Sequence, residues 1–238
     1  MIDTILFDLD GTLLPFVQED FLKIYIGLIA GRAAKFGYQK EAFTKALWAG
    51  TASMAKNDGS CSNRDAFWET FSGILGKNVL ELEDEFEDFY AVEFDKTGAC
   101  LQYKPDYSAF IASLKARGFK IVLATNPLFP PVAVQTRLSW VGLGGEDFDY
   151  ITNYKNSSFC KPNPGYYRAI LGEIGKAPEA CLMVGNNTNE DMCAGALGMD
   201  VYLVTENIEN AGDIPPESFK NGSFSDFIAF AAALPDPR

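Results

Sequence analysis

The chain has 238 residues, with 20 Lys and Arg against 32 Asp and Glu, so its formal net charge is −12. So acidic a chain is poorly suited to the phosphate backbone of nucleic acids, and we expect no nucleic-acid partner. The sequence contains no histidine. This excludes histidine general bases, Ser-His-Asp and Cys-His nucleophile systems, and zinc sites that use histidine. Any catalysis must therefore use carboxylates, lysine or hydroxyl groups.

The apolar segments and the cysteines indicate the kind of compartment in which the protein works. No apolar run reaches the roughly 18 residues that a membrane-spanning helix needs. The first residues carry acids where a signal peptide carries basic side chains. The five cysteines are odd in number and lack Cys-x-x-Cys spacing, which is typical of reduced thiols. We expect a cytoplasmic monomer or homodimer that does not bind membranes.

Short apolar runs alternate with helical patterns along most of the chain. The runs cover residues 4–7, 120–124, 150–152, 181–184 and 201–204. Alternation of this kind predicts an α/β fold, in which crossover helices connect the strands of a parallel sheet.

A long segment, about residues 15–100, separates the first two runs and contains no convincing strand pattern. Its apolar residues recur at helical spacing instead. Examples are Phe21, Ile24 and Leu28. We therefore expect a helical module inserted after the first strand. Its aromatic residues Trp48, Phe67 and Trp68 are more typical of a packed core than of ligand contacts.

Two carboxylates, Asp8 and Asp10, directly follow the first run. Open α/β sheets place their active sites at this end of a strand. Side chains alternate along a strand, so both aspartates start on one face, and Gly11 then allows a sharp turn. Carboxylates this close repel each other unless a cation lies between them, which points to a divalent metal, most simply Mg²⁺. The alternative is a turn that merely caps the strand.

Three further polar sites each come just after a strand run or before a helix. Thr125 and Asn126 follow the second run, Lys161 begins a Lys-Pro-Asn-Pro sequence, and a polar segment, residues 186–191, follows Gly185. Taken singly, Thr125 and Lys161 are typical loop or cap residues. Four such sites in one chain favour a single shared site at the carboxyl ends of the strands.

Taken together, the four motifs resemble those of the haloacid dehalogenase (HAD)-like hydrolase superfamily, in the same order along the chain. The resemblance implies a Rossmann-like, doubly wound parallel sheet formed by residues 1–15 and 100–238. It also implies that residues 16–99 form an inserted helical cap domain of the C1 type. The motifs cover the whole chain except this insert.

The resemblance further implies a phosphatase that acts on a small phosphorylated metabolite. Asp8 would be the nucleophile that forms an aspartyl phosphate. Asp10 would be the general acid and base. Thr125, Asn126 and Lys161 would bind the phosphoryl oxygens. Mg²⁺ would be bound by Asp8, by the backbone carbonyl of Asp10 and by the last motif.

The last motif departs from the family pattern, which has an acidic residue directly after the glycine. Here Asn186 and Asn187 lack that charge, although an amide oxygen can still bind Mg²⁺. The candidate ligands are Asn186 and Asp191. The pairings of Asn186 with Glu190 and of Asn187 with Asp191 stay open.

Three other functions compete with a phosphatase. A dehalogenase uses the same aspartate nucleophile without a metal, but it needs no proton donor at Asp10. A phosphomutase has no specific support in the sequence. A degenerate member that binds a phosphorylated ligand without turnover is supported only by Asn186 and Asn187, against the intact first three motifs.

Overall fold

The computed structural model describes residues 1–210 and 214–237; residues 211–213 and 238, in the second part of the expected sheet domain, lie outside this description. Its centre is a six-stranded parallel sheet with strand order β3-β2-β1-β4-β5-β6. The strands are β1 (Thr4–Phe7), β2 (Lys120–Leu123), β3 (Tyr150–Ile151), β4 (Cys181–Gly185), β5 (Asp200–Val204) and β6 (Lys220–Gly222). The predicted α/β fold with a parallel sheet is confirmed.

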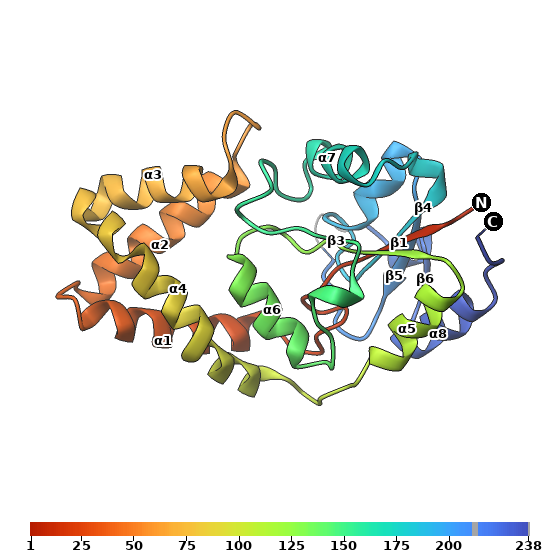
Figure 1. The fold of residues 1–238 in the computed structure, drawn as a ribbon, viewed down its shortest axis with the longest axis horizontal. Helices are drawn as coiled ribbons and strands as arrows, with labels where there is room; N and C mark the ends of the chain where they lie inside the picture. Colours follow the sequence, from red (N-terminus) through yellow and green to blue (C-terminus); the bar gives the residue numbers. More distant parts are fainter. Residues whose placement is uncertain (211–213, 238) are drawn as a thin grey trace.

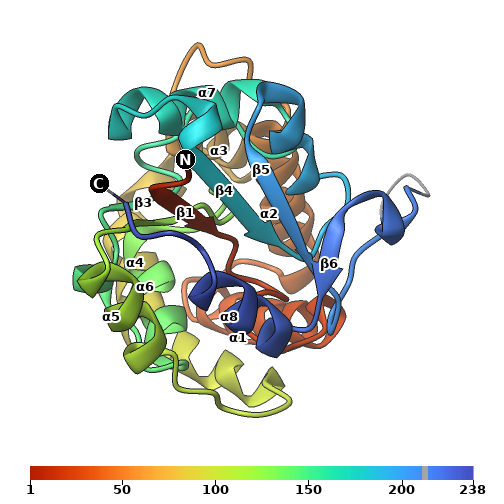
Figure 2. The same cartoon turned by 90° about the vertical axis from the view of Figure 1, so that its right-hand side faces the viewer.

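Helices cover both faces of this sheet (Figure 2). They are α5 (Ser108–Ala116), α7 (Pro164–Ile174) and α8 (Phe224–Ala232), whereas α6 (Pro131–Ser139) lies between the sheet and the inserted helices (Figure 1). The two faces can be traced from adjacent residues of the central strand. Phe7 contacts Phe110 of α5 and Phe227 of α8, whereas Leu6 packs with Tyr167 of α7. All four residues of β1 are fully buried, as expected for a strand covered on both faces.

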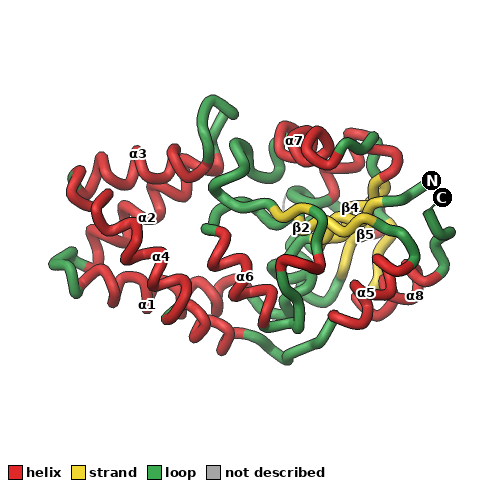
Figure 3. The backbone as a smooth tube through the Cα atoms, in the orientation of Figure 1, coloured by secondary structure: helices red, strands yellow, loops and turns green. Residues whose placement is uncertain are grey.

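Every element between β1 and β2 up to residue 100 is helical. The elements are α1 (Gln18–Ala34), α2 (Lys40–Ala55), α3 (Asn63–Leu75) and α4 (Glu83–Val92), with 3-10 segments at Lys77–Leu82 and Phe94–Cys100. The helices α1 to α4 gather beyond one end of the sheet (Figures 1 and 3). Helix α6 contacts α4 and so connects the two groups of elements. No helix among the described residues is long and apolar enough to span a bilayer.

The sheet topology decides where the polar motifs meet. Strand β1 lies between β2 and β4 in the sheet, so the segments that follow these three strands meet at one edge. The first motif, the Thr125-Asn126 pair and the segment after Gly185 are therefore brought together by strand order alone. Each is far from the others in sequence.

Candidate active site

Lys161 lies between two buried carboxylates. Its Nζ donates to Oδ1 of Asp8 at 2.8 Å and to Oδ1 of Asp191 at 2.6 Å. Burial alone lowers the pKa of Lys161, but the charges of Asp191 and Asp8 raise it well above the ordinary value. Lys161 is therefore a permanent cation that compensates two acids at the carboxyl end of β1.

Thr12 connects the first motif to Asn186. The Oγ1 of Thr12 lies 3.2 Å from Oδ2 of Asp8 and 3.2 Å from Oδ1 of Asn186. The Asn186 amide donates to the carbonyl of Asn207 at 2.6 Å, which directs its oxygen toward Thr12. Gly11 has a φ of +82°, and a Cβ at this position would lie 2.2 Å from the Asn186 amide nitrogen. A glycine is therefore required between the two aspartates and Thr12.

Asp10 is held by a residue that the sequence did not reveal, Arg137 of α6. The Nη1 of Arg137 donates to both carboxylate oxygens of Asp10, at 2.8 and 2.6 Å. Burial raises the pKa of Asp10, Arg137 opposes this effect, Asp8 adds to it, and the result is a raised pKa. Arg137 is three residues after Val134 and four after Ala133 on the buried face of α6, so helical periodicity places it inward.

Thr125 and Asn126 both lie at the edge of the site, in different roles. Thr125 is buried, and its backbone carbonyl accepts from the hydroxyls of Thr152 at 2.7 Å and Tyr166 at 2.8 Å. The amide of Asn126 donates to the Glu190 carboxylate at 3.0 Å. The Oδ1 of Asn126 is buried and has no hydrogen-bond partner within the described residues. The structure thus joins the second motif to the fourth.

Asn187 shapes its own turn. Its Oδ1 accepts from the backbone N–H groups of Asn189 and Glu190, both at 2.9 Å. Its amide donates to the carboxylate of Glu209 at 3.0 Å. Burial raises the pKa of Glu209, the Asn187 amide lowers it, and the charges of Asp8 and Asp10 raise it further. Glu209 lies in the loop after β5 and belongs to no sequence motif, so no sequence signal identifies it.

Asp191 uses both of its oxygens in contacts with the protein. Oδ1 accepts from Lys161, and Oδ2 accepts from the backbone N–H of Asn187 at 2.9 Å. Burial raises its pKa, and Lys161 opposes that rise. A Cβ on Gly185 would lie 2.2 Å from the Asp191 carboxylate, so only glycine fits at the end of β4.

The side-chain oxygens present can be compared with the needs of Mg²⁺. Asp8 and Asn186 direct oxygens to the same Thr12 hydroxyl. Within the part of the chain that the structure describes, no three acidic or thiol side chains are arranged so that they alone could hold a metal ion. A site built from one carboxylate, one amide oxygen and a backbone carbonyl fits Mg²⁺, which prefers oxygen and keeps several waters.

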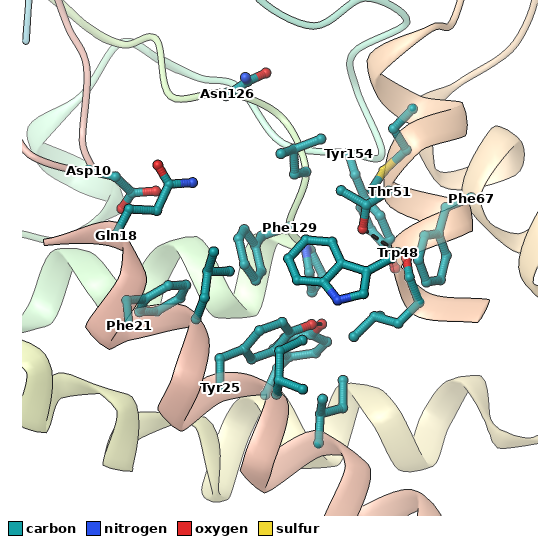
Figure 4. Close-up of a pocket in the computed structure, with 18 of the residues that line it drawn as sticks. Asp10, Gln18, Phe21, Tyr25, Trp48, Thr51, Phe67, Asn126, Phe129 and Tyr154 are labelled. Carbon is teal, nitrogen blue, oxygen red and sulfur yellow. Dashed lines mark hydrogen bonds between the residues drawn. The ribbon is translucent and has the colours of Figure 1, made fainter. Parts of the chain in front are cut away.

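These groups open into a cavity of about 230 Å³ that extends toward the inserted helices. Asp8, Asp10, Asn126, Asn186, Asn187, Glu190, Asp191 and Glu209 form its polar end. Figure 4 shows Asp10 and Gln18 on one side, with Tyr25, Phe129 and Trp48 further in. Thr125 and Lys161 are not part of the wall.

The aromatic residues of the insert were expected to belong to the core. All three of Trp48, Phe67 and Trp68 line the cavity, and Trp48 is 46% exposed and lies outside the core. Trp68 and Phe67 also belong to the packed interior, because Trp68 is buried among other aromatic side chains and Phe67 packs against the same core. The reason is that the cavity lies inside the helical layer and is bounded by α2 and α3, so their inward faces line it.

Comparisons with known proteins identify the family to which this chain belongs. Residues 2–198 match the haloacid dehalogenase-like hydrolase family. The chain is 26% identical to a pyrophosphatase PpaX from Bacillus velezensis over 60% of its own length and 64% of that protein. It is 22% identical to a phosphoglycolate phosphatase from Colwellia psychrerythraea over 89% of its own length and 88% of that protein. The first match thus spans less than two thirds of its relative.

Solved structures share the fold at lower sequence identity. A HAD phosphatase from Thermococcus onnurineus superposes with a TM-score of 0.60 at 19% identity, covering 98% of this chain and 100% of that one. An L-2-haloacid dehalogenase from Xanthobacter autotrophicus superposes with a TM-score of 0.55 at 18% identity, with the same coverage. The fold and the order of the motifs define a hydrolase of the HAD type, built on a parallel α/β sheet. This chain belongs to the haloacid dehalogenase-like hydrolase family.

Proposed function

We propose that the protein is a Mg²⁺-dependent phosphatase that hydrolyses a small phosphorylated metabolite through an aspartyl phosphate on Asp8. The observation that carries this proposal is the 2.8 Å contact between the Lys161 ammonium and the Asp8 carboxylate, at the carboxyl end of the central strand. Both curated relatives named above are phosphate-releasing enzymes by their names.

In the first step, an Asp8 oxygen bonds to phosphorus and the bond from phosphorus to the alcohol oxygen breaks. Asp10 gives its proton to the departing alcohol. In the second step, water attacks the same phosphorus, Asp10 takes a proton from it, and Asp8 is released with inorganic phosphate. The raised pKa of Asp10 supports the acid role because it keeps the proton available at higher pH than an ordinary aspartate does.

Binding of the phosphoryl oxygens is assigned to Thr125, Asn126 and Lys161. Lys161 already contacts Asp8, so its charge lies where a bound phosphoryl group would be attacked. Asn126 lies in the cavity wall and carries a buried oxygen without a partner in the described residues. Thr125 follows β2, the strand beside β1.

Mg²⁺ would be held by Asp8, the backbone carbonyl of Asp10 and Asn186. When bound, the ion supplies positive charge that screens the phosphoryl oxygens from the attacking carboxylate. Among the three open assignments of the last motif we favour the pair Asn186 and Asp191, with Asn186 as the direct ligand and Asp191 in a supporting role. Asn186 faces Thr12 and Asp8, whereas Asn187 faces Glu209, and Asp191 supports the site through Lys161.

Residues 16–99 are proposed to act as a cap domain over the carboxylates. The cavity connects Asp8 and Asp10 to side chains of α1, α2, α3 and α4. The phosphoryl chemistry therefore belongs to the sheet, and selection of the alcohol belongs to the insert. The five cysteines are free thiols, which suits a cytoplasmic location.

A dehalogenase is the second candidate, because solved dehalogenases share the fold. Chloride release from 2-chloropropionate, with no phosphate released from any ester, would favour it.

The test of the main proposal is a phosphate-release screen over a panel of metabolites, with and without Mg²⁺. We expect release that requires Mg²⁺ and is absent in the Asp8→Asn variant.

A further inference from the structure

The cavity that contains Asp8 and Asp10 has two ends of opposite character. One end is lined by the carboxylates and amides that follow the carboxyl ends of the strands. The other end is lined by large apolar side chains from the inserted helices and the loop after β2, among them Tyr25, Leu47, Trp48, Phe67 and Phe129. A phosphate monoester bound with its phosphorus at Asp8 would extend its alcohol into the apolar end.

No lysine or arginine is among the described residues that line this cavity, and the chain has no histidine. The acidic residues in the wall of the insert, Glu83 and Glu87, are paired outside it with Arg64 and Lys155. Lys161 pairs with Asp8 and Asp191. A second anionic group on the substrate would thus meet carboxylates and aromatic rings without a cation to pair with, which is costly in a buried site.

The volume of the cavity gives a scale for the alcohol. An apolar cavity of about 150 Å³ in a protein core holds benzene. The cavity here has about 230 Å³ including its polar end, so once a phosphoryl group fills that end there is still room for an apolar group about the size of benzene or for an alkyl chain. Apolar surface enclosed there gains free energy roughly in proportion to its area.

We propose that the substrate is the phosphate monoester of an uncharged apolar alcohol, bound with its apolar group against Trp48 and Phe129. This inference rests on the proposed phosphatase function and narrows its substrate class. Hydrolysis breaks the bond between phosphorus and the alcohol oxygen, consumes one water, and releases the apolar alcohol and inorganic phosphate. Pyrophosphate and phosphoglycolate, for which the two relatives are named, both carry a second anionic group. Because the cavity wall offers no lysine or arginine among its described residues, we expect it to disfavour the binding of both compounds.

The decisive experiment measures kcat/KM for methyl, butyl and octyl phosphate with the wild-type protein and Mg²⁺. The three alcohols leave with similar intrinsic difficulty, so the series isolates apolar contact from leaving-group activation. Each fully buried methylene is worth about fourfold, and we expect kcat/KM for octyl phosphate to exceed that for butyl phosphate by about tenfold or more. Pyrophosphate, phosphoglycolate and choline phosphate complete the panel.

A matched pair of variants locates the effect. Trp48→Ala removes a cavity side chain that is 46% exposed, and Ile74→Ala removes an apolar side chain that is 48% exposed on α3, outside the cavity wall. Trp48→Ala should reduce the preference for octyl over methyl phosphate about tenfold or more, whereas Ile74→Ala should leave it unchanged. The wild-type series remains decisive if a variant does not fold.

Four results would overturn the inference. A flat or falling chain-length series, or a preference for pyrophosphate or phosphoglycolate, would exclude an apolar alcohol while leaving the phosphatase function intact. A preference for choline phosphate over octyl phosphate would show that the aromatic end binds a cation. Failure to hydrolyse any ester in the panel would remove the phosphatase function, and this inference with it.

Discussion

Arg137 donates from its Nη1 to both oxygens of Asp10, at 2.8 and 2.6 Å, from a side chain that is wholly buried. Its Nε and Nη2 have no hydrogen-bond partner among the described residues, and the guanidinium lies 4.5 Å from the centre of the Phe129 ring. Within the described residues, the positive charge of Arg137 is therefore compensated only by the Asp10 carboxylate and by the face of the Phe129 ring. This pair links the stability of the protein to the proposed acid and base.

Replacing Arg137 should destabilise the fold. Arg137→Met leaves the Asp10 charge without its partner, but the Asp10 side chain is 35% exposed and can be partly hydrated, so the free energy of unfolding should fall by about 1–3 kcal/mol. The control is Arg168→Met at an exposed position of α7, which should stay within about 0.5 kcal/mol of wild type. Urea unfolding measures both. Equal stabilities for the two variants would show that the ion pair contributes nothing.

Asp8→Asn should abolish turnover and leave the fold intact, because asparagine has nearly the same shape but cannot form an acyl phosphate. Asp3→Asn, the same substitution just before β1, should retain activity, since Asp3 pairs with Lys176 outside the cavity. Phosphate release and circular dichroism are the measurements. Activity of Asp8→Asn within tenfold of wild type would disprove its role as the nucleophile.

Asp10→Asn should reduce kcat/KM by roughly 10² to 10⁴, with the larger loss for esters of poor leaving groups. For the wild type, kcat/KM should fall as pH rises through the raised pKa of Asp10, because the acid form is lost there. The variant should lack this fall. Equal losses for 4-nitrophenyl phosphate and an alkyl phosphate would argue against proton donation by Asp10.

Asn186→Asp should tighten Mg²⁺ binding by placing a second carboxylate opposite Asp8. Without the ion the two charges repel, so the melting temperature of this variant should be lower than that of wild type and rise more steeply with Mg²⁺. Asn187→Asp is the matched comparison, because Asn187 faces Glu209. Thermal unfolding against Mg²⁺ alone reports both. A larger Mg²⁺ effect in Asn187→Asp would support the shifted pairing.

The strands β1, β2, β4 and β5 could be predicted because each contains a buried run of apolar residues, and the short edge strand β3 because its Tyr150 and Ile151 are both apolar although only half-buried. The edge strand β6 was missed because it reads Lys-Asn-Gly, with two exposed side chains and no apolar pattern. The order of the strands then explains why the motifs that follow β1, β2 and β4 lie together at one end of the sheet. It does not depend on any residue of the insert.

The contacts around the motifs were harder to predict. Arg137 has a position on the buried face of α6, but nothing in the sequence says that a buried cation there faces Asp10. Glu209 reaches the site through backbone bonds to Asn186 and Thr188, which exist only once the loop after β5 is folded. The cavity wall also combines helices from the insert with the loop after β2, a contact between distant segments that periodicity does not encode.

The most direct measurement of the central claim is to trap the phosphoryl group on the protein. The wild-type protein is mixed with 4-nitrophenyl phosphate and Mg²⁺ in a single turnover, quenched in acid and reduced with borohydride, which converts an aspartyl phosphate to homoserine. Peptide mass spectrometry should find homoserine at position 8 and none in Asp8→Asn. Release of 4-nitrophenol ahead of inorganic phosphate with Asp8 unmodified, or homoserine at another aspartate, would contradict the proposed mechanism.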